Sequence, residues 1–567
     1  MTGPVDVLVV GAGPTGLALA AQLDALGVSV QVVDRRAAPF RESRAIVVQP
    51  RTLEVLRPLG LAERLVARGD PAPDFRLHLG TRVTRLRLGA ASMPDVGYPF
   101  LLMLPQAQVE AVLLEYLVER GVPVRWGTRF DTAIERDDDM LVTLRDGNGE
   151  RERVPARYLA GCDGAGSTVR AGAGIGFPER PYGAAALLAD VDLDTDLASD
   201  AAHVFLGSHG VLFFLHLREN APWRMVTIRS GSRRPDPLDA AGIADALTDG
   251  QVRVREVVWD SWVPLRRGFA TAFRAGRTVL AGDAAHVHSP AAAQGMNTGI
   301  QDAANLGWKL ALAAAGVPAA SELLDSYEIE RRPVDRATLA LTHLAYLVEA
   351  GANPLVGRAR SVVAPLAAPL VGFDLSRRLV VRVMGQLWLR YPPGPAVVGT
   401  PGRVGGPCPG ARMPDVDLRR DGVSLRLHDV LASPGFHLLL CGGHDAGLPA
   451  SGGHDAGLPA SGSPDAGFGA SGAGDWEWRY RRWLTVHRIA DRSGPGVLGD
   501  PGRRLVRPGG VQYLVRPDGY VAYRAVGYDV GRLVDLLARW LPATSPAQTA
   551  PTPGRTSATD GPATDGY

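Results

Sequence analysis

The sequence predicts an α/β protein in which a Rossmann-like nucleotide-binding domain is interrupted by an antiparallel sheet and followed by a smaller α/β unit. Three observations lead to this fold class. The chain opens with a strand, a helix and a second strand around a GxGxxG turn. Between residues 180 and 275 the pattern changes to short strands separated by turns. The segment Arg277 to Leu312 then has the pattern strand, turn, helix, which returns the chain to the first domain.

The first element is an uninterrupted apolar run from Val5 to Val10, typical of a strand buried on both faces of a parallel sheet. The turn GAGPTG at residues 11–16 follows, and a helix with regularly spaced leucines continues to Gly27. A second strand, Val28 to Val33, ends at Asp34. The three elements form one complete βαβ unit.

Each special residue of this unit has a physical task. Gly11 makes the tight turn, Gly13 lets the backbone approach a pyrophosphate, and Gly16 allows the helix to pack closely on the strand. Asp34 stands where an acidic side chain accepts a hydrogen bond from a ribose hydroxyl. A glycine-rich turn without a ligand is the alternative. The nucleotide site is favoured over it because strand, helix, second strand and acid stand in register.

Further elements of this domain follow along the chain. The sequence predicts helices from Pro50 to Leu56 and from Gln106 to Gly121. Strands are predicted at residues 122–126, 140–144 and 158–161, and the last leads into Cys162-Asp163-Gly164. The inserted sheet is predicted to contain strands at residues 185–191, 211–217, 224–228 and 253–259.

The segment Arg277 to Leu312 organises the rest of the chain. A strand from Thr278 to Ala281 runs into a tight Gly282-Asp283 turn, a loop rich in proline and alanine follows, and a helix begins near Asn297. A loop that leads into a helix presents free N–H groups and the positive end of the helix dipole. Such a site suits an anionic or electron-rich ligand. An ordinary strand-turn-helix connection without a ligand is an equally weighted alternative. Residues 321–391 are predicted to be mostly helical.

The C-terminal part begins after a linker rich in proline and glycine, residues 392–409. An α/β unit at 410–542 is predicted to hold strands at 436–440, 483–489, 512–516 and 521–524 and a helix at 530–541. Within it the sequence GGHDAGLPAS at 442–451 occurs again at 452–461. The insert 442–475 and the tail 543–567 are predicted to be disordered, since they hold few large apolar residues. The remaining boundaries are 1–179 and 276–391 for the nucleotide-binding domain and 180–275 for the inserted sheet.

Composition excludes several classes of function. The 61 basic and 59 acidic residues nearly cancel, so no field of one sign favours nucleic acid or an anionic membrane. Cys162, Cys408 and Cys441 lie far apart and lack ligand spacing, so neither a disulfide framework nor a metal site is predicted. No signal peptide or membrane span is recognised, and a cytoplasmic protein is expected. Lys309 is the only lysine.

With GAGPTG, Asp34, Cys162-Asp163-Gly164 and Gly282-Asp283 in this order, the chain resembles the group A flavin-dependent aromatic monooxygenases. These include p-hydroxybenzoate hydroxylase, phenol hydroxylases and the hydroxylases that tailor aromatic polyketides in antibiotic biosynthesis. The resemblance covers roughly residues 4–390 and implies an FAD-binding domain with an inserted antiparallel-sheet substrate domain. The last region resembles the thioredoxin-like C-terminal domain of the phenol and polyketide hydroxylase branch. Without a CxxC motif, this domain is not expected to perform dithiol chemistry.

Carried over residue by residue, the resemblance implies an FAD site that runs along the first domain. The turn with Gly11, Gly13, Pro14, Thr15 and Gly16 would contact the pyrophosphate, Asp34 with Arg35 beside it the adenosine ribose, and Phe130 the adenine. Arg44 and Gln106 would meet the phosphate and ribityl region, Asp163 and Gly164 both FAD and NAD(P)H, and Gly282 with Asp283 the ribityl chain. Pro290 and the loop Gly295-Met296-Asn297 would border the isoalloxazine ring.

One feature departs from the family pattern. Ala292-Ala293 stand where the family usually has a pair of glycines. If the flavin must approach this backbone closely, the two methyl groups would change its position or its mobility.

The resemblance also implies the reaction. NADPH or NADH gives a hydride to FAD, oxygen adds at the flavin C4a atom, and the resulting hydroperoxide passes one oxygen atom to an electron-rich aromatic ring. The expected partners are O2 and a small aromatic substrate, a polycyclic phenol or quinone of polyketide type, with the protein a monomer or homodimer. A Baeyer–Villiger oxygenation, a flavin reductase that does not activate oxygen, and a flavin-binding protein without catalysis are the alternatives.

Substrate contacts are expected from the inserted sheet. Its candidates are Phe213, Phe214, His216, Trp223 and Arg224, with ordinary core or surface roles as the equal alternative. His286 and His288 are close in sequence to the proposed flavin loop, and either could deprotonate a phenol. A structural hydrogen-bonding role is favoured for both, so no catalytic acid or base is assigned.

Overall fold

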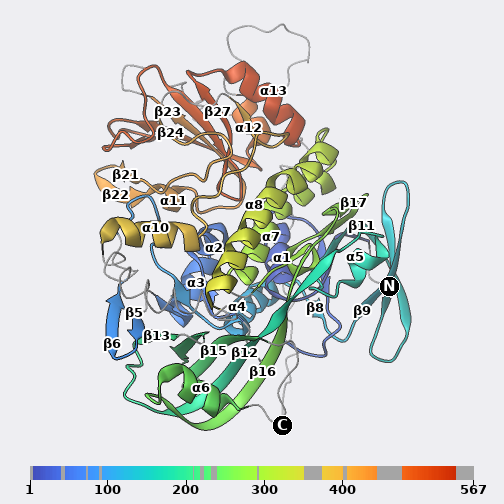
Figure 1. Ribbon diagram of the computed structural model, residues 1–567. Coiled ribbons are helices and arrows are strands. Elements are labelled where there is room, and N and C mark those ends of the chain that lie inside the picture. Colours follow the sequence, from blue (N-terminus) through green and yellow to red (C-terminus); the bar gives the residue numbers. More distant parts are fainter. Residues whose placement is uncertain are drawn as a thin grey trace, which may run out of the picture.

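The computed structural model describes residues 4–39, 45–71, 74–87, 92–207, 210–217, 223–230, 239–289, 293–349, 373–399, 405–442 and 475–544. These residues form a mixed α/β fold with three eight-stranded sheets and one three-stranded sheet. In Figure 1 the first sheet and its helices lie in the middle of the molecule, with the second sheet below and the C-terminal sheet above. The predictions for Arg44, Pro290, Ala292, nearly all of the repeat insert and the tail from 545 fall outside the described residues.

The first sheet is built around the apolar run at the start of the chain. Its strands follow the order β17, β18, β11, β1, β2, β8, and β10 and β9 extend it beside β11. β1 pairs in parallel with β2 and β11, and β11 pairs in parallel with β18. The bounds are β1 Val5–Val10, β2 Val30–Val33, β8 Val124–Arg125, β9 Arg129–Glu135, β10 Met140–Arg145, β11 Arg151–Gly161, β17 Arg274–Ala275 and β18 Thr278–Leu280.

The register of this sheet brings three loops together. Val10 lies beside Val33 and Gly161, and Gly161 lies beside Leu280. The carboxyl ends of parallel strands open at the same edge of a sheet, and ligands of such sheets bind there. The loops after β1, β11 and β18 therefore meet, although they are separated by more than a hundred residues in the sequence.

Three helices of the first domain pack side by side, since α1 contacts both α4 and α7. The helix α7 is buried from Asn297 to Ala314, because small residues let its neighbours approach closely. A Cβ atom on Gly307 would lie 2.7 Å from the Cβ of Gln22 in α1. The bounds are α1 Pro14–Ala25, α2 Pro50–Leu56, η1 Arg57–Leu59, α3 Leu61–Arg68, α4 Gln106–Glu119, α5 Thr168–Gly172, η3 Gly282–Ala284, α7 Gly295–Ala314, α8 Ala320–Glu349 and α10 Asp374–Met384.

The second sheet follows the order β19, β16, β12, β15, β14, β13, β5, β6, and α6 packs on one of its faces. β12 and β16 are longer than predicted, and β5, β6 and β13 were not predicted. β5 pairs in parallel with β13, and no local pattern reveals a pairing across so many residues. The bounds are β5 Asp74–Leu79, β6 Arg82–Leu86, β12 Glu179–Asp194, β13 Ala201–Gly207, β14 Gly210–His216, β15 Trp223–Ser230, α6 Ala240–Thr248, β16 Arg253–Phe269 and β19 His286–Val287.

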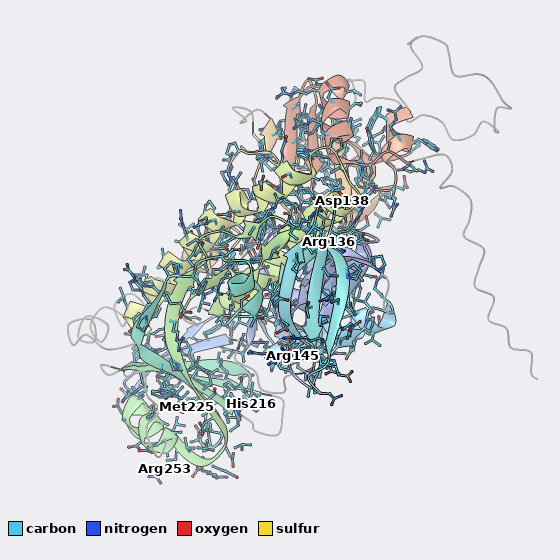
Figure 2. All side chains as sticks on the ribbon, turned by 90° about the vertical axis from the view of Figure 1, so that its right-hand side faces the viewer. Arg136, Asp138, Arg145, His216, Met225 and Arg253 are labelled. Carbon is cyan, nitrogen blue, oxygen red and sulfur yellow. The ribbon has the colours of Figure 1, made fainter. Side chains whose placement is uncertain are left out.

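Figure 2 views the molecule from the side. The β9–β10 extension, marked by Arg136, Asp138 and Arg145, is well separated from the outer part of the second sheet, marked by His216, Met225 and Arg253.

A three-stranded sheet is formed by β3 Val47–Val48, β4 Asp70–Pro71 and β7 Leu102–Met103.

The C-terminal sheet follows the order β20, β27, β26, β23, β24, β25, β21, β22. The predicted hairpin around Arg516-Pro517-Asp518-Gly519 is confirmed, since β26 and β27 pair antiparallel on either side of it. The bounds are β20 Val398–Gly399, β21 Asp417–Arg420, β22 Val423–Arg426, α11 Leu427–Val430, β23 Phe436–Cys441, α12 Asp475–Tyr480, β24 Leu484–Ala490, β25 Val497–Gly499, β26 Val511–Val515, β27 Val521–Val526 and α13 Val530–Trp540.

A buried charge network joins the C-terminal unit to the first domain. Glu330 of α8 accepts hydrogen bonds from Lys309 Nζ at 2.8 Å, from Arg516 Nη1 at 2.6 Å and from Asn305 Nδ2 at 2.7 Å. Arg516 and Asp518 come from the β26–β27 turn, which thereby reaches α7 and α8. The single lysine of the chain is thus fully buried, and burial lowers its pKa to about 8 against the opposing attraction of Glu330.

Within the part of the chain that the structure describes, no helix combines the length and the apolar character needed to cross a membrane.

Candidate functional site

The three loops at the edge of the first sheet are held together by close backbone contacts. A Cβ atom on Gly11 would lie 2.3 Å from the carbonyl oxygen of Cys162, and one on Gly16 would lie 1.9 Å from that of Gly11. Gly11 also adopts a φ of +107°, which side chains rarely allow. These two positions therefore require glycine for packing, as the sequence pattern predicts.

Gly13 differs from its two neighbours in the motif. A Cβ atom built on it would meet nothing within 4 Å, so the third position of the turn faces open space. Gly13 is also the N-cap of α1, and no side chain caps this helix end. Uncapped N–H groups and the positive end of the helix dipole thus point into a free space that a pyrophosphate could fill.

Asp34 lies beside this helix start. Its Oδ2 atom accepts a hydrogen bond from the backbone N–H of Ala12 at 2.7 Å, and its carboxylate also binds Arg36. Burial tends to raise the pKa of Asp34, but the hydrogen bonds from Arg36 and Ala12 outweigh it and keep the pKa below the ordinary value. The structure brings Arg36 to Asp34, whereas Arg35 is exposed. The guanidinium of Arg36 also lies 5.7 Å from the centre of the Trp126 ring.

Two further predicted cofactor residues stand on neighbouring elements. Gln106 begins α4, where its backbone N–H binds the carbonyl of Ala45 and its side chain binds Glu110. Phe130 on β9 is buried in the core of the first domain. Its ring would lie 3.2 Å from a Cβ atom on Gly172, so the side chain packs inward.

Asp163 uses its carboxylate to begin the helix α5. Its Oδ2 atom accepts hydrogen bonds from the backbone N–H of Thr168 at 2.6 Å and of Val169 at 3.2 Å. Gly164 follows with a φ of +84°, and no atom lies within 4 Å of a Cβ built there. Arg170 of this helix received no role from the sequence. It donates to the carbonyls of Ala165 and Ala284, and so links the loops after β11 and β18.

The Gly282-Asp283 turn is packed against the first helix. Gly282 has a φ of +62°, and a Cβ atom there would lie 2.6 Å from Thr15 Oγ1. A Cβ atom on Gly299 of α7 would lie 2.2 Å from the same oxygen. Thr15 is therefore the point where α1, this turn and α7 meet, and the side chain of Asp283 stands exposed next to it.

The start of α7 is fixed by the side chain of Asn297. Its Oδ1 atom accepts from Gln49 N at 2.9 Å and from Thr52 Oγ1 at 2.8 Å, and its Nδ2 atom donates to Val47 O at 2.8 Å and to Ala293 O at 3.1 Å. Asn297 is thus fully occupied by protein partners. Gly295 and Met296 are half-buried at the same helix start.

Ala293 adopts a left-handed backbone conformation, with a φ of +51°. This is one of the two alanines that replace the family's glycines, and its methyl group sits where glycine is the residue without strain.

We expect Ala293→Gly to leave the free energy of unfolding unchanged or to raise it by up to about 1 kcal/mol, because relief of strain offsets the added freedom of the unfolded chain. An ordinary alanine in a helix would lose about 1 kcal/mol on the same change. Urea denaturation of the variant, with Ala311→Gly in α7 as the control, measures the difference. An equal loss in both variants would contradict the strain.

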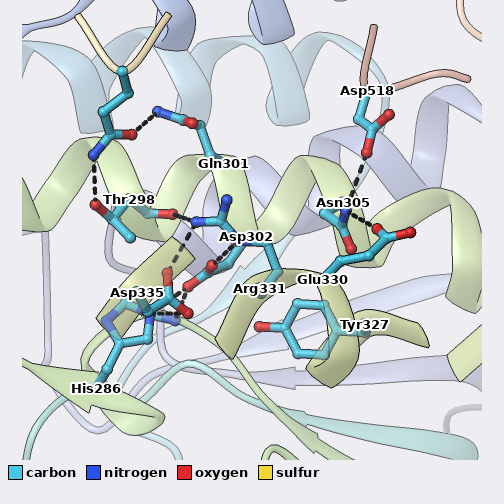
Figure 3. A network of polar contacts seen from close by, with 12 residues as sticks. His286, Thr298, Gln301, Asp302, Asn305, Tyr327, Glu330, Arg331, Asp335 and Asp518 are labelled. Atoms are coloured by element: carbon cyan, nitrogen blue, oxygen red, sulfur yellow. Dashed lines mark hydrogen bonds and ion pairs between the residues drawn. The ribbon is translucent and has the colours of Figure 1, made fainter. Parts of the chain in front are cut away.

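A buried ionic cluster contacts the turn through the backbone N–H of Gly282, and Figure 3 shows its side chains. Asp302 Oδ2 accepts from Gly282 N at 3.0 Å and from His286 Nε2 at 2.7 Å, and its Oδ1 atom accepts from Arg331 Nε at 2.6 Å. Asp335 lies 3.2 Å from Arg331 Nη2 and 3.5 Å from His286 Nε2. His286, Asp302 and Asp335 are close enough to share a metal ion, but Arg331 already supplies a cation between the two carboxylates.

The pKa values of the two histidines near the turn are shifted in opposite directions. Burial lowers the pKa of His286, but Asp335 and Asp302 outweigh it and raise the pKa to about 9. The rings of His286 and His288 are stacked with centroids 5.8 Å apart. Burial and the neighbouring His286 lower the pKa of His288 to about 4, so His288 is neutral at pH 7.

We expect the stability of the protein to fall in alkaline solution because of His286. The stabilisation from its charge is complete below about pH 6.5, the value of an unfolded histidine, and is lost as the pH rises through about 9. The loss should be on the order of 3 kcal/mol, because each pKa unit of the shift corresponds to about 1.4 kcal/mol. Chemical denaturation at pH 6.5 and 9.5 tests this, with His286→Gln as the control that lacks the titrating group. Equal pH dependence in both proteins would contradict the assignment.

The candidates on the second sheet divide between its two faces. Phe214 and Trp223 belong to the apolar core under α6, and the ring of His216 stands edge-on to Trp223. By strand alternation Phe213 and Arg224 face the other side, where Arg224 Nε donates to Asp190 at 2.6 Å. The apolar cluster on that side includes Tyr346 of α8. Phe213 and Arg224 therefore remain candidates for substrate contact, whereas Phe214 and Trp223 are packing residues.

Comparison with known proteins places this chain in a family. A family described as "FAD binding domain" matches residues 4–342. The chain is 37% identical over 549 residues to the 6-methylpretetramide 4-monooxygenase of Streptomyces rimosus, covering 92% of this chain and 90% of the relative. It is 32% identical to a 12-dehydrotetracycline 5-monooxygenase/anhydrotetracycline 6-monooxygenase of Streptomyces rimosus subsp. rimosus, covering 94% and 98%.

A solved structure agrees with this assignment. The OxyS anhydrotetracycline hydroxylase from Streptomyces rimosus superposes with a TM-score of 0.71 at 28% identity, covering 95% of this chain and 100% of that one. The mixed α/β fold with several sheets is thus that of FAD-dependent hydroxylases. The chain belongs to the FAD- and NAD(P)H-dependent aromatic monooxygenases, as the resemblance in its motifs indicated.

Proposed function

We propose that this monooxygenase hydroxylates a polycyclic phenol or quinone of the aromatic polyketide type. The observation that carries the proposal is the similarity to a monooxygenase named for 6-methylpretetramide, which extends over nine-tenths of both chains. Such a span includes the second sheet and the C-terminal unit as well as the nucleotide-binding residues. Phe213 and Arg224 are the proposed substrate contacts on the inner face of the second sheet.

FAD would lie across the three loops at the edge of the first sheet, and the residues there fit it. The open space at Gly13 and the uncapped start of α1 suit its pyrophosphate. Asp34 and Arg36 would bind the adenosine ribose, and Asp283 the ribityl chain. We also propose the remaining cofactor contacts that the family resemblance implies, made by Arg44, Gln106, the backbone near Phe130, Asp163, Gly164 and Pro290.

When bound, FAD supplies the redox chemistry, namely acceptance of a hydride from NADPH or NADH and activation of O2. The protein would contribute binding, orientation and exclusion of water. The N–H groups at Gly295 to Asn297 and the positive end of the α7 dipole would stabilise negative charge on the isoalloxazine edge, whereas the N–H of Thr298 donates to the carbonyl of Gln294. Asn297 would hold this helix start rigidly, because its side chain joins it to residues 47–52.

We also propose the domain division 1–179 with 276–391, 180–275 and 410–542, with a thioredoxin-like C-terminal domain and a monomeric or homodimeric, cytoplasmic protein. In the C-terminal sheet β23 pairs in parallel with β24 and antiparallel with β26, and this mixed pairing supports the proposal of a thioredoxin-like domain. Size-exclusion chromatography with light scattering measures the oligomeric state.

The substrate class is tested by incubating FAD-loaded protein with NADPH or NADH, O2 and either a tetracyclic phenol or a simple phenol. We expect faster NAD(P)H oxidation and a product heavier by one oxygen atom with the tetracyclic compound. Preference for the simple phenol would overturn the substrate proposal. A product that hydrolysis opens to an acid would be an ester or lactone and would show a Baeyer–Villiger oxygenation. Formation of hydrogen peroxide without an oxygenated product from every phenol would favour the reductase alternative.

A further inference from the structure

The Gly282-Asp283 turn rests on one buried carboxylate. Asp302 receives the backbone N–H of Gly282 and the imidazole of His286 on the same oxygen, and Arg331 on the other. We propose that His286 is a positioning residue for FAD, whose positive charge balances the cluster of Asp302, Arg331 and Asp335 and so keeps this turn in its cofactor-binding shape. The inference rests on the placement of the ribityl chain beside Asp283 proposed above.

The geometry makes Asp302 the link between the charges and the turn. All four side chains of the cluster are at most 3% exposed, so water cannot replace a lost partner. If the charge on His286 disappears, Arg331 alone faces two carboxylates, and repulsion from Asp335 would displace the Asp302 carboxylate that holds the Gly282 N–H. The turn that carries Asp283 would then shift with Asp302.

The charge count explains why a cation is needed at this position. Asp302 and Asp335 together carry two negative charges, and Arg331 carries one positive charge. Without a further proton the buried cluster would hold one uncompensated negative charge, which is strongly unfavourable in a protein interior. A second proton on the imidazole of His286, whose Nε2 atom lies 2.7 Å from Asp302 and 3.5 Å from Asp335, makes the cluster neutral.

The other polar groups around His286 do not provide this charge. Tyr327 of α8 donates its hydroxyl to the carbonyl of Leu280, and burial raises its pKa well above the ordinary value. Cys162 at the end of β11 is buried, and burial raises the pKa of its thiol. His288 is kept neutral by burial and by His286 itself. His286 and Asp335 are thus the two places for the balancing proton.

A charge-balancing role can be separated from a purely steric one with two substitutions. Burial and the Asp302 charge raise the pKa of Asp335 to about 7, so at pH 8 His286→Gln removes the cation and leaves one negative charge in excess. His286→Gln combined with Asp335→Asn removes one charge of each sign, so that Asp302 and Arg331 remain as a neutral pair. If charge is what matters, the second substitution should repair the first; if the imidazole ring is needed for packing, it should not.

The experiment measures FAD dissociation constants by flavin fluorescence on the apoprotein, together with the melting temperature of the apoprotein without FAD. We expect His286→Gln to weaken FAD binding by about tenfold or more and to lower the melting temperature. The double variant should recover most of both losses. A double variant that binds FAD as poorly as His286→Gln, or a His286→Gln protein that binds like the wild type, would overturn the inference.

Asp283→Asn serves to separate this inference from the cofactor placement. A loss of FAD affinity in Asp283→Asn without a change in melting temperature supports the placement. Wild-type affinity in Asp283→Asn would overturn the placement and the proposed effect on FAD with it. If Asp283→Asn loses FAD affinity as expected but the double variant does not recover the affinity lost in His286→Gln, only the role of His286 is overturned.

Discussion

Replacing Gly13 by aspartate is expected to abolish FAD binding while leaving the folded apoprotein at least as stable as the wild type. A side chain at Gly13 meets no atom within 4 Å, and its φ of −83° suits any residue. Aspartate is a favoured N-cap, so it should stabilise α1 by about 1 kcal/mol. The same carboxylate would occupy the helix start and repel a pyrophosphate. We expect FAD affinity to fall at least about 100-fold, since two charge-assisted hydrogen bonds of about 1.5 kcal/mol each would be lost.

Gly16→Ala is the matched control within the same motif. Its added methyl group would lie 1.9 Å from the carbonyl oxygen of Gly11, so this variant should lose stability even without FAD. Thermal unfolding of both apoproteins and FAD titration by fluorescence distinguish the two effects. Normal FAD affinity in Gly13→Asp would show that the pyrophosphate does not lie at α1.

The second large effect concerns the join between the first domain and the C-terminal unit. Glu330→Gln keeps the shape of the side chain but leaves Lys309 and Arg516 as buried cations without their carboxylate. Burial would raise the pKa of Glu330, yet Arg516 and Lys309 outweigh it and lower the pKa to about 2, so the native residue is ionised. Removing one partner of a buried ion pair costs about 3–5 kcal/mol, and we expect a loss of that size in urea denaturation.

Glu322→Gln provides the control for this prediction. Glu322 lies on the same helix α8 and also pairs with an arginine of the C-terminal unit, Arg539, at 2.7 Å. Both partners of that pair are more than half exposed, so its loss should cost at most about 1 kcal/mol. Similar losses in the two variants would contradict a special role for the buried network.

Local patterns in the sequence predict the nucleotide-binding unit well. The strand Val5–Val10 has the predicted bounds, because a continuous apolar run and a glycine turn leave little choice. The pairing of β5 with β13 and the full lengths of β12 and β16 depend on distant partners, and no periodicity within one segment encodes them. The fold class is therefore more predictable than the second sheet.

The site was predictable where a residue type has one physical task, and less so where neighbours compete. Gly11 and Gly16 are required by contacts within one motif. Whether Arg35 or Arg36 turns toward Asp34 depends on the path of the chain after β2, and the sequence does not distinguish two adjacent arginines. His286 was seen as a candidate base, but its partners Asp302 and Asp335 come from α7 and α8, which only the fold brings together.

The burial of Lys309 has a practical consequence for following how this protein opens. A protease specific for lysine has a single peptide bond to cut in the chain, and that bond lies in the middle of α7. The Lys309 side chain is 0% exposed, so the cut requires α7 to leave both α8 and the β26–β27 turn. One clean cleavage into two fragments would therefore report, on a gel, how often the centre of the molecule unfolds.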